Sequence, residues 1–404
     1  MNLSCLLLGC MALVGIAGSP EIVNVGPSWP PYRADSPWNL AIGPRPDVDP
    51  LSDRYIDAMH GPFGCNPDRY TIPVYEVDGA AARETVRVDK YFSRVSGDGD
   101  RLDIDKDSRP AIPWPANALP AAGTDANLVV LDPVSGDEWG LWQLRRIDGG
   151  WTAVNGYHYN IRWSGVPPQG FRSRGAGVPY LAGLVRPREI AEGRIRHTLA
   201  FGVNYPSDRR VFPATKTDST RDDDWLLPMG SRLQLDPALG EEDFRTWGLD
   251  RTGMIIARAL QEYGMILVSG SGHPKIYVES SNTADWRGIL DKNTVAPIPY
   301  AAFRLLALDA PPRPEPVASV SVTQTEAGVQ VSFPAAAHAG RYRIVREEDG
   351  QRRLLTETAT GGSYLDATPS EGLRCRYLVT AVSRNGVSDP VASEAIVVRR
   401  ADLP

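Results

Sequence analysis

Residues 374–398 read RCRYLVTAVSRNGVSDPVASEAIVV, which is two strand patterns separated by a turn-forming segment. In the first pattern Cys375, Tyr377, Val379 and Ala381 fall on one face by the period of two that a strand has. Working outward toward the N-terminus, similar runs recur at Val317–Gln324, Val329–Phe333, Arg341–Glu347, Arg352–Glu357 and Ser363–Ala367. Seven short strands within about 100 residues predict a β-sandwich.

The wording of residues 374–398 closely resembles the last two strands of a fibronectin type III module. The resemblance implies a seven-stranded sandwich over residues 317–399. Such modules serve as spacers and binding units outside the cell, so the resemblance also implies an exported, modular protein.

Composition places the chain among globular proteins, with 42% apolar and 23% charged residues in 404. Gly and Pro, at 38 and 35 residues, favour many turns and short strands over long helices. The net charge of −6 offers no footprint that would neutralise phosphates, so nucleic acid is not an expected partner.

The N-terminus is apolar and then stops at small residues, with Gly15 and Ala17 forming an A-x-A-like site. This pattern predicts a signal peptide over residues 1–17 and a secreted mature chain without a membrane span. Two alternatives stay open. The run could remain as an uncleaved anchor, since no Lys or Arg precedes it, or LLGC could direct acylation at Cys10 of a periplasmic or membrane-anchored lipoprotein.

Residues 18–309 predict a large β-rich domain. Strand-like runs from Tyr70 onward include ANLVVLD and EWGLWQL, which the five-residue segment PVSGD joins as a hairpin. Successive strands without intervening helices favour a β-sandwich or jelly roll with one or two short helices. We expect these helices at RPREIAEG and LDRTGMIIARALQEYG, and a further hairpin over residues 265–280. The Pro-rich linker at residues 310–316 predicts few contacts between the two domains.

Four phrases of the large domain are similar to those of a group of secreted bacterial β-sandwich proteins, most of which have no assigned activity. They are GTDANLVVLDPVSGDEWGLWQ, AGLVRPREIAEGRIRHTLAF, LLPMGSRLQLD and ARALQEYGMILV. The resemblance covers roughly residues 35–308. It implies export and a shared fold, and it transfers no catalytic residue.

The chain contains none of the common motifs for a nucleophile elbow, a nucleotide loop or a zinc protease. Glu138 and Trp142 share a strand face, with Gly140 leaving a gap between them. A carboxylate beside an aromatic plane suits a sugar ring, and Asp125 could bring a second carboxylate near. The alternative is an ordinary hairpin edge. Trp139 and Trp151 are further candidates for stacking on a sugar.

His197 lies in RIRHTLAFGV, where it shares a face with apolar residues. A histidine in such a place is either a core residue with satisfied hydrogen bonds or an imidazole at the floor of a pocket, able to act as acid or base. Both interpretations stay open, and His197 joins Glu138 and Asp125 as a candidate catalytic residue.

Neither a metal nor a cofactor is expected. DIDKD at residues 103–107 begins like a calcium loop but lacks the glycine and glutamate that such a loop needs later, so a solvated loop is favoured. Cys65 and Cys375 would remain after signal cleavage. A buried thiol is expected at Cys375, and pairing with Cys65 is the alternative.

Two hypotheses of function follow. The first is an exported carbohydrate-active enzyme, a glycoside hydrolase or polysaccharide lyase with a fibronectin type III accessory module, acting on polysaccharide or cell-surface glycan. The second is a non-catalytic surface protein that binds glycan or protein. The sequence leaves the oligomeric state undetermined.

Overall fold

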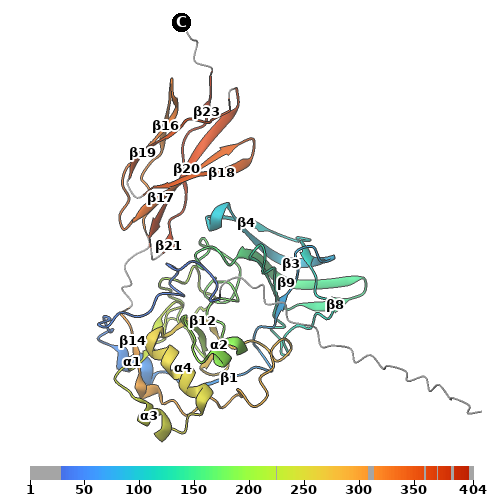
Figure 1. The fold of residues 1–404 in the computed structure, drawn as a ribbon, viewed down its shortest axis with the longest axis vertical. Helices are drawn as coiled ribbons and strands as arrows, with labels where there is room; N and C mark the ends of the chain where they lie inside the picture. Colours follow the sequence, from blue (N-terminus) through green and yellow to red (C-terminus); the bar gives the residue numbers. More distant parts are fainter. Residues whose placement is uncertain are drawn as a thin grey trace, which may run out of the picture.

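The computed structural model describes residues 29–223, 225–307, 314–358, 361–370, 372–383 and 386–399 (Figure 1). The predicted signal peptide and the first four residues of the predicted linker lie outside them. The protein is mainly β, as predicted, with several sheets and few helices. None of the helices in the described ranges is long and apolar enough to cross a membrane.

The first sheet has eight strands. Its path is β2 (Val74–Glu76), β6 (Leu128–Leu131), β7 (Asp137–Trp142), β9 (Gly150–Asn160), β3 (Arg83–Ser96) and β4 (Arg101–Asp105), with β5 (Ala111–Pro113) on β3 and β8 (Arg145–Ile147) on β9. The predicted hairpin forms, since β6 pairs antiparallel with β7 and β7 with β9. However, β3 runs parallel to β9 and β2 runs parallel to β6. Parallel neighbours need long crossovers, which the local turn signals do not mark.

The second sheet has six strands in the order β1 (Gly64–Cys65), β13 (Lys275–Ile276), β10 (Leu199–Val203), β12 (Met265–Gly270), β11 (Arg232–Leu235) and β14 (Phe303–Leu305). The hairpin predicted over residues 265–280 is wrong, because β10 lies between β12 and β13. Every residue of β10 is buried. Such a strand is stable only with neighbours on both edges and cover on both faces.

Both predicted helices form. α4 (Arg251–Glu262) begins after Asp250, whose Oδ1 accepts a hydrogen bond from the Gly253 N–H at 2.7 Å. α2 (Pro187–Glu192) begins at its proline and ends at Gly193 with φ of 80°. Two short helices, α1 (Ser52–Asp57) and α3 (Glu241–Thr246), were not anticipated.

Residues of both sheets and of α4 share one large core. A second apolar cluster covers the other face of the first sheet. The N-terminal segment packs into the large core, where the Trp38 indole N–H donates to the Gly165 carbonyl at 3.0 Å. This segment also brings Tyr32 against the first sheet.

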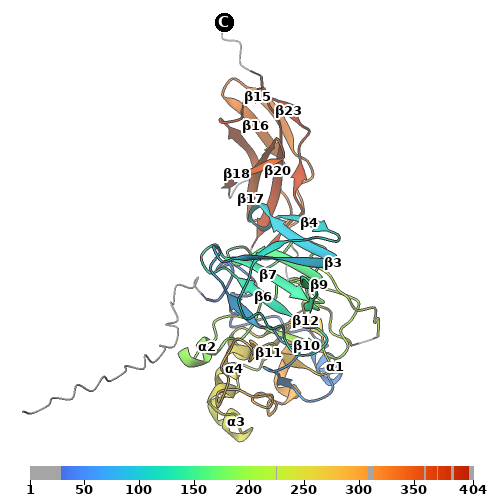
Figure 2. The same ribbon diagram turned by 90° about the vertical axis from the view of Figure 1, so that its right-hand side faces the viewer.

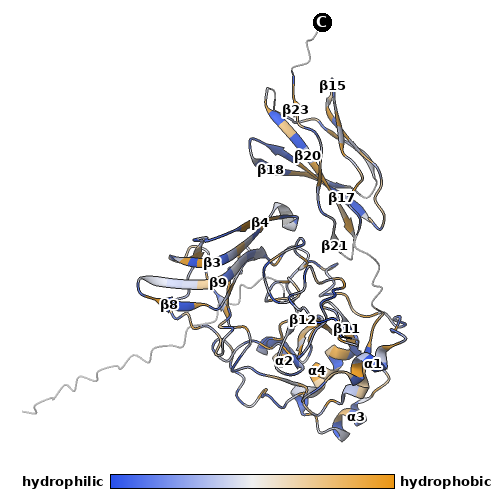
Figure 3. Ribbon diagram, turned by 180° about the vertical axis from the view of Figure 1, so that it is seen from behind, coloured by the Kyte–Doolittle hydropathy of each residue, from blue (hydrophilic) through white to orange (hydrophobic). Residues whose placement is uncertain are grey.

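The C-terminal residues form a sandwich of two further sheets, in agreement with the sequence pattern. One contains β15 (Ser321–Thr325), β16 (Gly328–Phe333) and β19 (Gly362–Asp366); the other contains β17 (Arg341–Glu348), β18 (Gln351–Thr358), β20 (Arg374–Ser383), β21 (Gly386–Val387), β22 (Val391–Ala392) and β23 (Ile396–Val397). Hydrophobic and hydrophilic residues interleave along these strands (Figure 3). The predicted core forms, with Phe333, Cys375 and Tyr377 in one cluster.

The C-terminal sandwich sits at the end of the first sheet, near β3 and β4 (Figure 2). More contacts cross this boundary than the linker predicts. Asp100 and Arg343 are both buried, and Asp100 Oδ2 lies 3.8 Å from Arg343 Nη1 and accepts a hydrogen bond from the Thr380 hydroxyl at 3.5 Å. Asp100 is therefore shielded from solvent, because the sandwich covers it.

Candidate functional site

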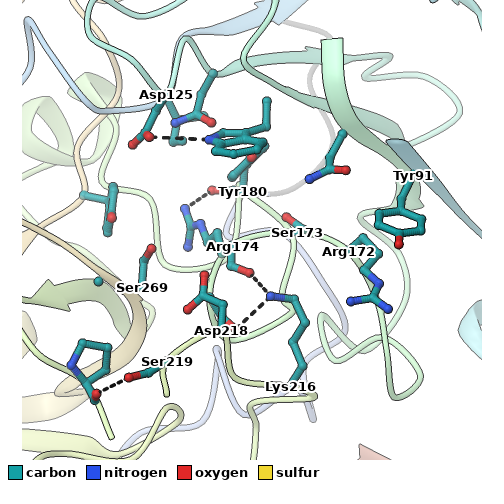
Figure 4. Close-up of a pocket in the computed structure, with 18 of the residues that line it drawn as sticks. Tyr91, Asp125, Arg172, Ser173, Arg174, Tyr180, Lys216, Asp218, Ser219 and Ser269 are labelled. Carbon is teal, nitrogen blue, oxygen red and sulfur yellow. Dashed lines mark hydrogen bonds between the residues drawn. The ribbon is translucent and has the colours of Figure 1, made fainter. Parts of the chain in front are cut away.

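A cavity of about 690 Å³ opens between the two sheets of the large domain (Figure 4). On one side it meets the carboxyl ends of the parallel strands β10 and β12, with Asn204 and Ser269 in its wall. The first sheet contributes Tyr91 from β3, Trp142 from β7 and Asn155 from β9. Ligand sites in sheets with parallel strands commonly lie beyond the carboxyl ends of those strands. The fold therefore makes this cavity the first candidate for a site.

Four polar atoms of the cavity wall are buried without a hydrogen-bond partner among the described residues. They are Asn127 Oδ1, Asn155 Oδ1, Ser173 Oγ and Arg174 Nε. Leaving a buried polar group unpaired costs about 1–3 kcal/mol, so most such groups in folded proteins are satisfied. Two acceptors, one hydroxyl and one guanidinium N–H of the wall residues thus have no partner among the described residues, and each of these atoms is almost wholly covered by protein.

Aromatic rings form much of the remaining wall. The lining residues of this kind are Tyr91, Trp142, Tyr180, Tyr205 and Tyr277. Four of these rings have a guanidinium over them. Arg172 lies 5.0 Å from the Tyr91 centroid and Arg221 lies 4.2 Å from that of Tyr205, while Arg174 lies 5.6 Å from that of Tyr180 and 5.0 Å from that of Tyr277. The cavity therefore offers flat apolar faces beside polar atoms.

Two of the predicted site residues meet at this cavity. Asp125 and Trp142 both line it, and the Trp142 indole N–H donates to Asp125 Oδ1 at 3.5 Å. The loop of Asp125 is held by main-chain bonds that extend the hairpin, including one from the Gln143 N–H to the Asp125 carbonyl at 2.7 Å. The carboxylate beside this tryptophan is therefore Asp125, whereas the sequence pattern paired the tryptophan with Glu138.

Glu138 lies behind the cavity wall and is fully buried. Its Oε1 accepts hydrogen bonds from the Tyr157 hydroxyl and, at 3.3 Å, from the Leu181 N–H, while Oε2 accepts from Tyr32 at 3.4 Å. The Tyr157 hydroxyl in turn accepts from the Tyr180 N–H at 2.6 Å. Burial raises the pKa of Glu138 to about 7, although its hydrogen bonds favour the charged form. Glu138 therefore holds the segment that carries Tyr180 into the cavity.

The gap expected at Gly140 is filled from within. A Cβ at Gly140 would lie 2.1 Å from a ring carbon of Tyr157, so that ring occupies the space beside the glycine. Tyr157 faces Gly140 across the β7–β9 pair. The gap admits this neighbouring side chain and leaves no room there for a sugar ring, which corrects that part of the prediction.

His197 lies away from the cavity, among buried residues. Its Nε2 is 3.0 Å from Glu189 Oε1, its Nδ1 is 2.9 Å from the Thr198 carbonyl, and its ring meets Trp29 edge-on at 6.2 Å. Burial alone would lower the pKa of His197, but the attraction of Glu189 outweighs it and the pKa is raised. This position agrees with the interpretation of His197 as a partnered core residue.

Trp139 and Trp151 lie on the other face of the first sheet. Trp139 packs 5.2 Å from the His158 ring and Trp151 packs 5.4 Å from Trp114, all ring centroids. Both tryptophans belong to the apolar cluster on that face. Because side chains alternate along a strand, Trp139 and Trp142 cannot share a face.

Sequence reasoning missed the basic residues of the wall. Lys90, Arg172, Arg174, Lys216 and Arg221 all line the cavity. They come from three separate segments, and only the run FRSRG at residues 171–175 brings two of them close in sequence. Alternating arginines in a glycine-rich loop were the one local signal available.

Other candidate sites in the described ranges have fewer features of a binding site than this cavity. A second hollow, of about 1030 Å³ over residues 66–69 and 281–292, contains none of the unpartnered buried atoms found in those ranges. No group of three His, Cys, Asp or Glu side chains in the described ranges could hold a metal ion. Cys65 and Cys375 are both buried free thiols.

No protein-family model and no curated protein matches the chain. Solved structures similar to it include a fibronectin type III-like protein from Clostridium thermocellum, 21% identical, covering 24% of this chain and 99% of that one at a TM-score of 0.18. A human fibronectin type III domain is 20% identical over 24% of this chain and 97% of its own, with a TM-score of 0.21. A pectate lyase from Pectobacterium carotovorum is 19% identical over 19% and 24%, at 0.17. Scores this low identify no shared function.

Proposed function

We propose that the protein is an exported carbohydrate-active protein that binds a saccharide in the cavity of its large domain and cleaves a polysaccharide there. Export is part of the proposal and follows from the predicted signal peptide and the C-terminal module. The observation that carries the proposal is the combination of aromatic faces with unpartnered polar atoms in one cavity.

A sugar ring has an apolar face and an edge of hydroxyl groups. Trp142 and the tyrosines of the wall supply planes for the apolar face. Asn127 Oδ1 and Asn155 Oδ1 are acceptors without donors among the described residues, and hydroxyl groups are donors of the required kind. A cavity of about 690 Å³ is within the range that binds small molecules or a few units of a polymer.

Asp125 is the proposed catalytic residue. Among the three residues predicted for this role, it is the one that lines the cavity, since Glu138 lies behind the wall and His197 lies elsewhere. Asp218 supplies a second carboxylate to the wall, as hydrolysis by paired carboxylates would need. Glu138 acts as a positioning residue, through Tyr157 and the Leu181 N–H.

The second candidate is a non-catalytic binder of glycan. One observation favours it: Glu138, the buried carboxyl with a pKa near 7, is shielded from the cavity by the residues it bonds. Because Glu138 does not line the cavity, the site has fewer groups that could transfer a proton to or from a ligand.

A polysaccharide panel tests both candidates. Affinity electrophoresis reports binding, and assays for reducing ends and for unsaturated products report hydrolysis and elimination. With the polymer that is cleaved, Asp125→Asn should lower turnover by roughly 10²- to 10⁴-fold and keep the fold. Asp218→Asn is the matched variant of the second carboxylate. Binding without cleavage would favour the second candidate, and no binding to any polymer would refute both.

A further inference from the structure

We propose that the saccharide bound in this cavity is acidic, with its carboxylate or sulfate groups held by the basic residues of the wall. The inference rests on the proposed function of the same cavity and names its substrate class. The cavity wall has five Lys or Arg residues and two Asp, an excess of three positive charges. The whole chain has a net charge of −6, so the cavity has the opposite sign to the protein around it.

Four of the five basic residues of the wall form no ion pair with another described residue. None of the ion pairs found between described residues involves Lys90, Arg172, Arg174 or Lys216, whereas Arg221 pairs with Asp223 at 3.5 Å. Elsewhere on the surface some arginines do have carboxylate partners, as Arg145 has in Asp89 and Arg194 in Glu262, and others have none. Four cations without a close carboxylate around one cavity favour an anionic occupant.

Arg174 carries the argument furthest. Its Nη1 and Nη2 donate to the carbonyls of Ala182 at 2.9 Å and Tyr180 at 2.5 Å, and these bonds fix the guanidinium in place. Its Nε is buried without a partner among the described residues. Burial lowers the pKa of Arg174 from its ordinary value, which means that the surroundings disfavour its charge. An anion at Nε would complete both the hydrogen bonding and the charge balance.

Lys216 stands on the same side of the cavity (Figure 4). Its ammonium donates to the carbonyls of Arg174 at 2.6 Å and Gly175 at 3.0 Å, so one of its three N–H donors has no such role. Burial lowers the pKa of Lys216, and the longer-range attraction of Asp218 opposes this. The ammonium is thus fixed by carbonyls, which orient it without cancelling its charge.

Arg172 and Lys90 also line the cavity, and both lie next to Tyr91 of β3 in space or in sequence. Arg172 lies over the Tyr91 ring in Figure 4, and both Arg172 and Lys90 are exposed to solvent. Several cations around one cavity suit a chain with repeated acidic groups better than a single anion.

The neutral groups of the wall narrow the ligand further. Asn127 Oδ1 and Asn155 Oδ1 are acceptors, and an acceptor repels phosphate or any other anion that has no donor of its own. A ligand must therefore bring hydroxyl donors and negative charge together, beside flat apolar faces. Uronates and sulfated sugars meet all three conditions.

The test compares polymers that differ only in charge. The full-length protein is titrated with polygalacturonate and with its methyl ester, which has the same backbone without the carboxylates. A carrageenan, sulfated and free of carboxylate, and neutral glucans complete the set. We expect at least one acidic polymer to bind at least about tenfold more tightly than its neutral counterpart, as the loss of a charge-assisted hydrogen bond predicts. Whether the uronate or the carrageenan binds identifies the anionic group.

Variants separate the cavity from general charge attraction. Arg172→Gln and Lys90→Gln each remove one exposed cation of the wall and should weaken the acidic polymer about tenfold while leaving the neutral one unchanged. Arg287→Gln is the matched control, since Arg287 is exposed and lies outside the cavity. Equal binding of acidic and neutral polymers, or an equal effect of Arg287→Gln, would overturn the inference and leave the proposed function standing. Failure of every saccharide to bind would refute both.

Discussion

Glu138 was expected at an open sugar site, and in the structure it is fully buried. In the unfolded chain its carboxyl group titrates near 4.5, whereas burial raises its pKa to about 7 in the folded protein. Between these values the folded chain holds a proton that the unfolded chain has released. The folded state is therefore stabilised by this group below about pH 4.5, and that stabilisation is lost as the pH rises to about 7.

Glu138→Gln tests this linkage, because an amide of nearly the same shape carries no titrating proton. We expect the free energy of unfolding of the parent protein to fall relative to that of the variant by about 3 kcal/mol between about pH 4.5 and 7. Urea unfolding at a series of pH values measures it. Glu192→Gln, on the exposed side chain that pairs with Arg196, is the control and should give a curve parallel to the parent. If Glu138→Gln also runs parallel, Glu138 is ionised in the folded state throughout this range.

The sequence could bring Asp125 near Trp142, because the hairpin between them is local and the turn segment PVSGD marks it. It could not place Glu138. The period of two puts Glu138 and Trp142 on one face, but the ring of Tyr157 that covers that face comes from the next strand. Which side chain fills a gap depends on packing between strands, and a single strand pattern does not contain it.

At the scale of one element, β20 shows how much a strand pattern does contain. Its predicted buried face is present, and Tyr377 packs in the core of the C-terminal sandwich. The pattern did not reveal the polar end of this residue, whose hydroxyl donates to Asp366 Oδ2 at 2.8 Å. Asp366 also accepts a hydrogen bond from Arg346 at 2.7 Å, so Asp366 would keep a partner without the Tyr377 hydroxyl.

Two substitutions separate the ring from the hydroxyl. Tyr377→Ala should cost about 3–5 kcal/mol of stability by opening a cavity in the core. Tyr377→Phe should cost only about 1 kcal/mol, because the ring remains and Asp366 keeps Arg346. The ten tryptophans all lie at or before Trp286, so their fluorescence follows the large domain alone while circular dichroism follows the whole chain. Because the closed boundary joins the sandwich to the large domain in one cooperative unit, the loss should appear by both probes. A Tyr377→Ala variant as stable as its parent would show that the strand register is wrong.

Other elements show where local reasoning ends. In the C-terminal sandwich β15 pairs with β16 and β17 with β18, as neighbours in sequence do, although β16 also pairs with β19 and β17 with β20. β12 and β13 were expected to pair for the same reason, but β10 inserts between them from more than 60 residues away. A strand buried at every position carries no alternation, so its sequence does not say which neighbours it takes.

At the scale of the whole molecule, the Pro-rich linker suggested two independent parts, and the boundary between them is instead closed by charge. Arg343 is buried in the C-terminal sandwich, where it pairs with Glu357 at 2.9 Å and faces Asp100 of the large domain. A second pair across the boundary, between Asp35 and Arg341 at 3.0 Å, is about a third exposed on each side. The composition of a linker indicates how two domains are joined, but it does not predict whether their surfaces form contacts outside the linker.

The two pairs differ in burial, so breaking them should cost different amounts of stability. Asp100→Asn removes the buried charge that Arg343 faces across the boundary, which should cost up to about 3 kcal/mol and loosen the C-terminal sandwich from the large domain. Asp35→Asn removes an equal charge from an exposed pair and should cost less than about 1 kcal/mol.

The two optical probes read the coupling directly. While the boundary is closed, thermal unfolding followed by fluorescence and by circular dichroism should coincide, which is the behaviour of one cooperative unit. In Asp100→Asn the circular dichroism transition should begin at a lower temperature than the fluorescence transition, since the sandwich then unfolds first. Asp35→Asn should keep the two curves together. If the curves already separate in the parent protein, the buried Asp100–Arg343 contact does not couple the two parts, and the accessory sandwich moves as the linker alone would allow.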